Sequence, residues 1–148
     1  MKKYIICLAF VSLFSCKEST FTPQPITNSN PLIFVGANQS ECLANSEPLT
    51  TKAVECASIN TTKFEGDILT VVVRQRAFCS SKFKLEQVVT GNNLLLKAND
   101  TSTEASRCMC NYDLTYTYTG AKTGLYKIDY EGKVYNNDPC KISTTASK

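Results

Sequence analysis

The sequence contains no histidine and no tryptophan, and its positive and negative charges nearly balance. Without histidine, a Ser-His-Asp triad, a Cys-His dyad and a zinc site with imidazole ligands are excluded. The sequence also lacks a glycine-rich phosphate loop and a carboxylate metal-binding motif. We therefore expect a protein that is not an enzyme and that has no cofactor and no metal site.

Long hydrophobic runs are scarce, and the clearest one lies at the N-terminus. Lys2 and Lys3 precede the uncharged run Tyr4–Phe14, which has about 11 residues. This is short of the ~20 apolar residues of a transmembrane helix and is typical of a secretory signal peptide. We expect residues 1–15 to be a signal peptide.

The tetrapeptide Leu13-Phe14-Ser15-Cys16 closes this run and resembles the lipobox of bacterial lipoproteins. The alternative is an ordinary signal peptide that happens to be followed by a cysteine. In lipoproteins of this type Cys16 would become the acylated N-terminus, and each buried methylene of its acyl chains, such as palmitate, would add about 0.8 kcal/mol to anchoring. The resemblance implies a protein attached through Cys16 to the bacterial outer membrane, facing either the periplasm or the cell surface.

Residues 16–148 carry almost no net charge. Loss of Lys2 and Lys3 leaves 14 basic and 13 acidic residues, a net charge of +1. With no cluster of Lys and Arg, this balance argues against a nucleic-acid-binding protein. Residues 16–31 hold Pro23, Pro25 and Pro31 among polar residues, which predicts a flexible linker with a reach of about 45 Å.

Residues 32–148 show short strand patterns separated by turn signals, which predict one all-β domain, either a sandwich or a barrel. Glu131-Gly132 is predicted as a hairpin turn. The secondary structure of residues 37–60 is ambiguous, because Lys52–Ser58 also fits a helical turn. The predicted strands are Leu32–Val35, Asp67–Cys79, Phe83–Val89, Leu94–Lys97, Cys108–Thr119 and Leu125–Tyr130.

The clearest of these strands is Cys108–Thr119, where apolar and polar residues alternate over twelve positions. Its inward positions carry cysteines and tyrosines, and Leu125–Tyr130 repeats the tyrosine pattern. One interpretation places these rings in the core with their hydroxyls at its rim. The other is an exposed aromatic surface that binds sugars or peptides, made of Tyr112, Tyr116, Tyr118, Tyr126 and Tyr130.

Six cysteines remain when Cys7 and Cys16 are set aside: Cys42, Cys56, Cys79, Cys108, Cys110 and Cys140. In an exported domain this even number predicts three disulfides, although the spacing allows 15 connectivities.

Strand geometry narrows the pairing of these cysteines. Cys108 and Cys110 lie two residues apart on one strand, about 7 Å between Cα atoms, and should bond different partners. We expect Cys79 to bond one of them and Cys140 the other. Cys42 and Cys56 would then close a loop of about 15 residues, worth roughly 3 kcal/mol. The rival interpretation is that the Cys-x-Cys pair binds copper or takes part in disulfide exchange.

The lipobox at Cys16, together with the run Cys108-Met109-Cys110-Asn111-Tyr112-Asp113-Leu114, resembles small lipoproteins of the Bacteroidetes. The resemblance implies an exported, lipid-anchored protein but no particular activity.

Two functions follow as hypotheses. The first is a non-catalytic binding or structural module that recognises an unknown protein or glycan. The second is a protective lipoprotein that blocks a hydrolase or toxin through loops such as Gly120–Gly124 or Asn92-Asn93.

Overall fold

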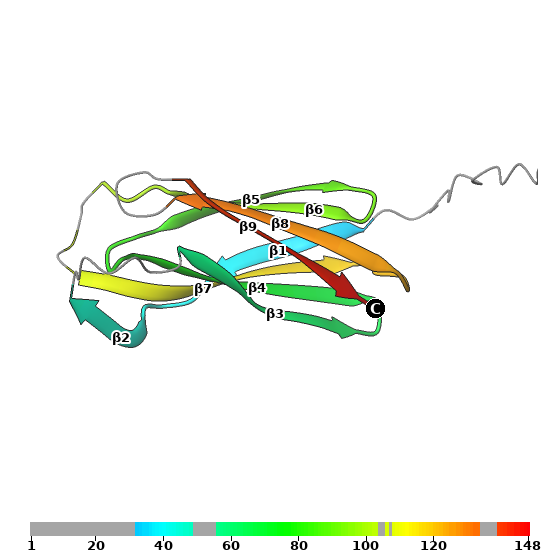
Figure 1. Ribbon diagram of the computed structural model, residues 1–148, viewed down its shortest axis with the longest axis horizontal. Coiled ribbons are helices and arrows are strands. Elements are labelled where there is room, and N and C mark those ends of the chain that lie inside the picture. Colours follow the sequence, from blue (N-terminus) through cyan, green and yellow to red (C-terminus); the bar gives the residue numbers. More distant parts are fainter. Residues whose placement is uncertain (1–31, 49–55, 104–105, 107, 134–138) are drawn as a thin grey trace, which may run out of the picture.

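The computed structural model describes residues 32–48, 56–103, 106, 108–133 and 139–148, and within them every regular element is a strand (Figure 1). These strands form two separate sheets, so the predicted all-β fold is confirmed in its sandwich form. In chain order they are β1 (Ile33–Gln39), β2 (Leu43–Pro48), β3 (Ala57–Glu65), β4 (Ile68–Phe78), β5 (Phe83–Thr90), β6 (Asn93–Asp100), β7 (Cys108–Thr119), β8 (Leu125–Lys133) and β9 (Pro139–Ser147).

The first sheet has the order β1-β7-β4-β3, with β2 also paired to β7, and the second has the order β5-β6-β8-β9. All pairs are antiparallel except β6 and β8. The chain leaves β6, crosses to β7 in the first sheet and returns to β8, so β6 and β8 run in the same direction. β3 and β9 are edge strands of the two sheets and lie next to each other.

The core lies between the sheets, and β7 supplies much of it. Every second residue of β7 from Cys110 to Tyr118 is buried. The register of β7 with β4 sets Leu114 beside Val73 and Tyr116 beside Val71. From the second sheet, β6 and β8 contribute Leu96 and Ile128, both fully buried. Period-two alternation therefore identified the buried face of β7 because this strand is covered on one side only.

The five tyrosines singled out in the sequence all belong to this core, and each is at most 3% exposed. An exposed aromatic surface on these residues is therefore wrong, because their rings fill the space between the sheets. Burial also raises the pKa of the hydroxyls of Tyr116, Tyr118 and Tyr130 well above the ordinary range.

The tyrosine hydroxyls find partners inside the sandwich, as buried phenols usually do. The Tyr116 hydroxyl donates to the carbonyl of Lys97 at 2.8 Å. The Tyr126 hydroxyl accepts from the Lys122 amide at 2.7 Å and donates to the Lys122 carbonyl at 2.9 Å. Within the described part of the chain, the buried hydroxyl of Tyr118 has no hydrogen-bond partner.

Gln75 is a buried polar residue of β4 that joins the two sheets. Its side chain is fully buried, donates to the Lys133 carbonyl at 2.7 Å and accepts from the Tyr130 hydroxyl at 2.5 Å. Gly132 lies against this pair: a Cβ there would come within 2.6 Å of Gln75 Oε1 and of the Tyr130 hydroxyl. The close packing of the two sheets at this point therefore requires glycine.

Two sequence expectations are corrected by the strands. Glu131-Gly132 is not a hairpin turn: both residues lie inside β8 and pair with Lys141 and Cys140 of β9. The glycine is needed for close packing and not for a turn. Of the ambiguous stretch 37–60, residues 57–60 begin β3 and pair with β4, while most of Lys52–Ser58 lies outside the described residues.

The sandwich has two unlike ends (Figure 1). At one end, called the loop end, lie Leu32, the turn at 66–67, the turn at 91–92, the loop 120–124 and Lys148. Hydrogen bonds join them: the Ala121 amide donates to the Asp67 carbonyl at 2.8 Å, and the Lys148 amide donates to the Gly124 carbonyl at 3.1 Å. The opposite end carries β2, the start of β7 and four cysteines.

Candidate functional site

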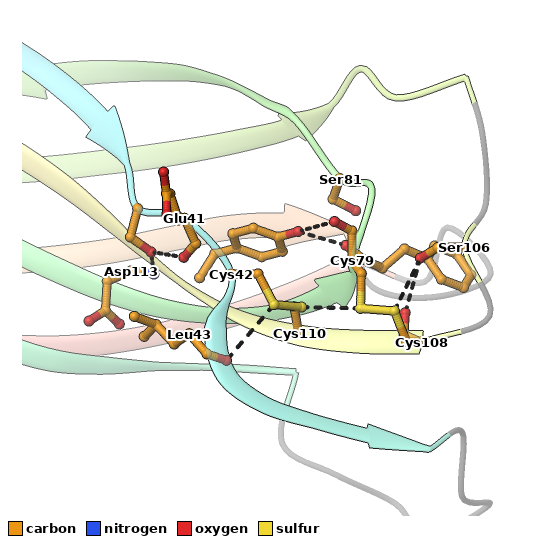
Figure 2. Close-up of a disulfide and its surroundings, with 12 residues drawn as sticks. Glu41, Cys42, Leu43, Cys79, Ser81, Ser106, Cys108, Cys110 and Asp113 are labelled. Atoms are coloured by element: carbon orange, nitrogen blue, oxygen red, sulfur yellow. Dashed lines mark hydrogen bonds between the residues drawn. A yellow bond between two sulfur atoms is a disulfide. The ribbon is translucent and has the colours of Figure 1, made fainter.

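Four cysteines at the end opposite the loop end bring their sulfur atoms into a row. Two disulfides, Cys42–Cys110 and Cys79–Cys108, lie end to end, and the sulfur atoms follow the order Cys42, Cys110, Cys79, Cys108 (Figure 2). The Sγ atoms of Cys110 and Cys79, which belong to different disulfides, are 3.1 Å apart. We call these four atoms the sulfur row.

The pairing of β4 with β7 places half of the row. The register sets Ala77 beside Cys110, so Cys79, two residues further along, lies opposite Cys108. Their Cα atoms are 5.6 Å apart and the Cys79 amide donates to the Cys108 carbonyl at 3.1 Å. A cross-strand disulfide fits this spacing without distorting the backbone.

The segment between β1 and β2 supplies Cys42. Ser40 fixes this segment against β7, because its amide donates to the Asp113 carbonyl at 2.9 Å and its hydroxyl accepts from the Asp113 amide at 3.0 Å. Two residues later Cys42 reaches Cys110, with 5.5 Å between Cα atoms. Cys42 is exposed, whereas Cys110 is 1% exposed.

Tyr112 binds the backbone next to the sulfur row. Its hydroxyl donates toward the carbonyls of Cys79 and Phe78, at 2.8 and 3.0 Å, and its ring meets that of Phe83 edge-on at 5.7 Å between centroids. Burial, and secondarily the charge of Asp100, raise the pKa of Tyr112 above its ordinary value. Tyr112 therefore holds the backbone at Cys79 and remains a hydrogen-bond donor.

Asp100, at the end of β6, anchors the loop that follows Cys79. Its carboxylate accepts from the Ser81 hydroxyl at 2.6 Å and from the Lys82 amide at 3.3 Å. Ser102 adds bonds from its amide and hydroxyl at 2.9 and 2.6 Å. Partial burial alone would raise the pKa of Asp100, but these donors outweigh it and hold the pKa below its usual value.

The third disulfide, Cys56–Cys140, lies apart from the row and joins the first residue before β3 to the second residue of β9. It therefore links the edges of the two sheets. Its Cα atoms are 5.7 Å apart, and 84 positions separate the two cysteines in the sequence.

The predicted disulfides are thus confirmed in number and only in part in pairing. Cys108 and Cys110 bond different partners, and Cys79 bonds one of them, as expected. The expected bonds of Cys42 with Cys56 and of Cys140 with the Cys-x-Cys pair are wrong. The reason is topological: β2 returns to β7 in the first sheet, whereas β9 closes the second sheet beside β3.

A metal at this site would need free thiolates. The Sγ atoms of Cys42, Cys79 and Cys110 lie within 4.8 Å of one another, close enough to share a soft metal ion. Each of the three sulfurs is bonded to another sulfur, so the oxidised protein offers no thiolate ligand there. Only reduction of both disulfides would create such a ligand set.

Asp67 and Asp113 are acids that could have formed a catalytic pair of carboxylates, but they are bound to different partners. Asp113 forms a two-pronged ion pair with Arg74 on the outer face of the first sheet, at 2.8 and 2.9 Å. Asp67 accepts from the Thr119 hydroxyl at 2.8 Å, and this bond, as the largest cause, lowers its pKa. The paired carboxylates that glycosidases use are therefore not formed by these two residues.

Sequence reasoning missed Gln75, Ser40 and Asp100. Gln75 lies between two arginines, which are typical of a solvated stretch, although its parity on β4 matches that of Val73 and Ala77. Ser40 binds backbone groups of Asp113, which is distant in the sequence, so the sequence carries no local signal for its role. Asp100 accepts from Ser102 two residues away, but its bonds to Ser81 and Lys82 join segments that are distant in the sequence. Cys16 and the predicted signal peptide and linker lie outside the described residues.

No protein-family model matches the chain, and neither a curated protein nor a solved structure is detectably similar to it. Among the described residues there is no helix that could span a membrane.

Proposed function

We propose that the protein is an exported lipoprotein, anchored by lipid on Cys16, whose sandwich is a non-catalytic binding module. The observation that carries the proposal is the complete pairing of Cys42, Cys56, Cys79, Cys108, Cys110 and Cys140 in three disulfides. Structural disulfides persist in oxidising compartments outside the cytosol. This agrees with the signal peptide and lipobox that the N-terminal sequence predicts.

The position of the chain's first described residue suggests which surface faces a partner. Leu32 lies at the loop end, and the sulfur row lies at the other end (Figure 1). An anchor on the N-terminal side of Leu32 would therefore enter the domain at its loop end. The proposed binding surface is the end of the sandwich around Glu41 and Cys42, which lies opposite the end where the linker joins the domain.

The anchor is tested with the variant Cys16→Ser in the full chain. Palmitate labelling of the wild-type protein and its loss in Cys16→Ser are expected, because the acyl chains are attached to this sulfur. The variant Cys7→Ser is a matched control that should keep the label. Labelling that survives in Cys16→Ser contradicts the proposed anchor.

A second candidate is favoured by the bracing of the loop 120–124. Tyr126 holds Lys122 by two hydrogen bonds and Asp67 holds Ala121, so the loop is rigid enough to insert into a target such as a hydrolase or toxin. In this case the loop end, and not the opposite end, would contact the partner.

One experiment separates the two candidates. Photo-crosslinking residues are placed in the anchored full chain at Glu41 and, as a matched exposed position at the loop end, at Lys122. The binding-module proposal predicts a crosslinked partner from Glu41. A partner captured from Lys122 alone supports the protective lipoprotein instead, and capture from neither position argues against both.

A further inference from the structure

The sulfur row has a geometry that structural bracing does not require. Two disulfides that merely tie strands together can lie anywhere along them, but here their inner sulfur atoms are 3.1 Å apart. The outermost sulfur of the row belongs to Cys42, which is exposed, and the inner sulfur of that bond belongs to Cys110, which is buried. An exposed bond therefore leads directly to a second bond behind it (Figure 2).

We propose that the sulfur row is a thiol–disulfide exchange site that accepts a low-molecular-weight thiol at Cys42 and releases a thiol at Cys108. The proposal concerns chemistry at the row and does not depend on the lipid anchor or on the partner.

The first step takes place at the exposed sulfur. The thiolate of the incoming molecule attacks Cys42 Sγ and forms a mixed disulfide with it, as in other exchange reactions. The Cys42–Cys110 bond breaks, and its electron pair leaves with Cys110 as a thiolate. Cys42 is the accessible end of this bond because Cys110 is 1% exposed.

The second step passes the bond along the row. The Cys110 thiolate attacks Cys79 Sγ, its neighbour at 3.1 Å, and a Cys79–Cys110 bond forms. The Cys79–Cys108 bond breaks, and Cys108 leaves as a thiolate that takes a proton from water. One thiol enters and one is released, so two disulfides are present before and after and no further oxidant or reductant is needed.

Burial gives this transfer its direction. A thiolate on Cys110 would be an uncompensated charge in the core, which is unfavourable. Cys108 is only partly buried, and the Ser106 hydroxyl lies 3.9 Å from its sulfur. Moving the negative charge from Cys110 to Cys108 therefore relieves the burial of charge.

The sulfur atoms need to approach by only about 1 Å to reach the length of a disulfide. Cys79 directly follows the last residue of β4 and stands in a turn, so the ladder between β4 and β7 does not hold it on both sides. Its backbone is held by the bond of its amide to Cys108 and by the Tyr112 hydroxyl, so the approach is a movement of the cysteine side chains.

Peptide mapping of the wild-type protein tests the proposal. The oxidised full chain is treated with glutathione at neutral pH, alkylated with N-ethylmaleimide at mildly acidic pH, where exchange is slow, and cleaved without reduction. Met109 lies between Cys108 and Cys110, so cleavage with cyanogen bromide separates the two cysteines. The expected product carries glutathione on Cys42, a Cys79–Cys110 bond and the alkyl group on Cys108, with alkylated Cys108 exceeding alkylated Cys110 by about tenfold or more.

Two outcomes would overturn the proposal. One is alkylation of Cys110 with the Cys79–Cys108 bond intact, which means reduction without transfer. The other is glutathione entering the separate Cys56–Cys140 bond as fast as it enters Cys42, which means that the row has no special reactivity.

Two variants approach the same product from opposite ends of the row. Cys42→Ala leaves Cys110 without its partner, and the expected protein has a Cys79–Cys110 bond with Cys108 free. Cys108→Ala leaves Cys79 without its partner, and the expected protein has the same bond with Cys42 free. A free Cys110 in the first variant, or a free Cys79 in the second, contradicts the transfer. Circular dichroism establishes that each variant is folded, and if neither folds, the glutathione map of the wild-type protein decides.

Discussion

The Cys56–Cys140 bridge, called the lone disulfide, and the two bridges of the sulfur row stabilise different parts of the fold. Cys56–Cys140 joins β3 of the first sheet to β9 of the second, and Gln75 of β4 binds Tyr130 and Lys133 of β8 in the same region. Registers confirm that these features are neighbours, since Ala57 pairs with Gln75 and Gly132 with Cys140. Both the covalent and the polar links in this region hold the two sheets together.

The bridges of the sulfur row instead link segments of the first sheet. Cys79 directly follows β4 and Cys108 is the first residue of β7, and a continuous antiparallel ladder already pairs these two strands. Cys42 lies just before β2, which also pairs with β7. In the chain-entropy model a bridge adds less when its loop is shorter: Cys79–Cys108 encloses 29 positions, whereas Cys42–Cys110 encloses 68 and Cys56–Cys140 encloses 84. The inner bridge of the row, Cys79–Cys108, can therefore change its bonding at smaller cost to the fold than Cys56–Cys140 can.

Removal of the lone disulfide should give the largest loss of stability. In the chain-entropy model, a bridge across 84 positions is worth about 4.5 kcal/mol. The double variant Cys56→Ala/Cys140→Ala should lower the free energy of unfolding by about this amount, measured by urea denaturation. A loss smaller than that of the row variant described next would contradict the contrast between the two regions.

Removal of the inner bridge of the row should cost less. Cys79–Cys108 spans 29 positions, for which the same model gives about 3.5 kcal/mol. The double variant Cys79→Ala/Cys108→Ala should therefore unfold at a higher urea concentration than the lone-disulfide variant does. Its β4–β7 amides should stay protected from hydrogen exchange, because the ladder does not depend on the bridge.

The polar link beside the lone disulfide should have the next largest effect. Gln75→Ala leaves the Lys133 carbonyl and the Tyr130 hydroxyl without their partner and opens a cavity, which together cost about 2–3 kcal/mol. Tyr118→Phe is the matched control: it removes a buried hydroxyl that has no partner among the described residues. Stability of this control should be unchanged or raised by about 1 kcal/mol. Equal losses in both variants would mean that the Gln75 bonds add nothing.

The sequence predicted the parts of this structure that depend on local alternation. β7, its buried face and the separation of Cys108 from Cys110 all follow from a period of two residues. The disulfide partners do not, because the return of β2 to β7 and the placement of β9 beside β3 join segments far apart in the chain. Local signals misled where a residue serves a distant contact: Gly132 packs against Gln75 and makes no turn.

The sulfur row was also beyond sequence reasoning, although all its cysteines were identified. Different partners for Cys108 and Cys110 could be inferred, but the 3.1 Å contact between the sulfur atoms of Cys110 and Cys79 depends on the pairing of β7 with β4, two strands distant in the sequence. Such a contact is decided by tertiary structure.

The smallest effect concerns pH and distinguishes the surroundings of the two regions. The pKa of Asp100 lies below its usual 3.8, since the donors Ser102, Ser81 and Lys82 outweigh burial. A group with a lowered pKa in the folded state stabilises the protein above its unfolded pKa, and the contribution is lost as the pH falls through the folded value. Asp100→Asn should therefore be less stable than wild type at pH 7 by about 1 kcal/mol, and the gap should close below pH 3.8.

Glu131→Gln provides the control on the side of the lone disulfide. The Glu131 carboxylate also has a lowered pKa, chiefly through its bond with Lys141, but its ion pairs lie at the surface and are screened by water. Denaturation curves from pH 7 to pH 2.5 should show a smaller pH-dependent difference from wild type than those of Asp100→Asn. If the two variants gave equal differences, the hydrogen bonds that the Asp100 carboxylate accepts would count for no more than a surface ion pair. The loop after Cys79 would then be held less firmly than its hydrogen bonds indicate. These bonds would accordingly restrain the proposed thiol–disulfide exchange less.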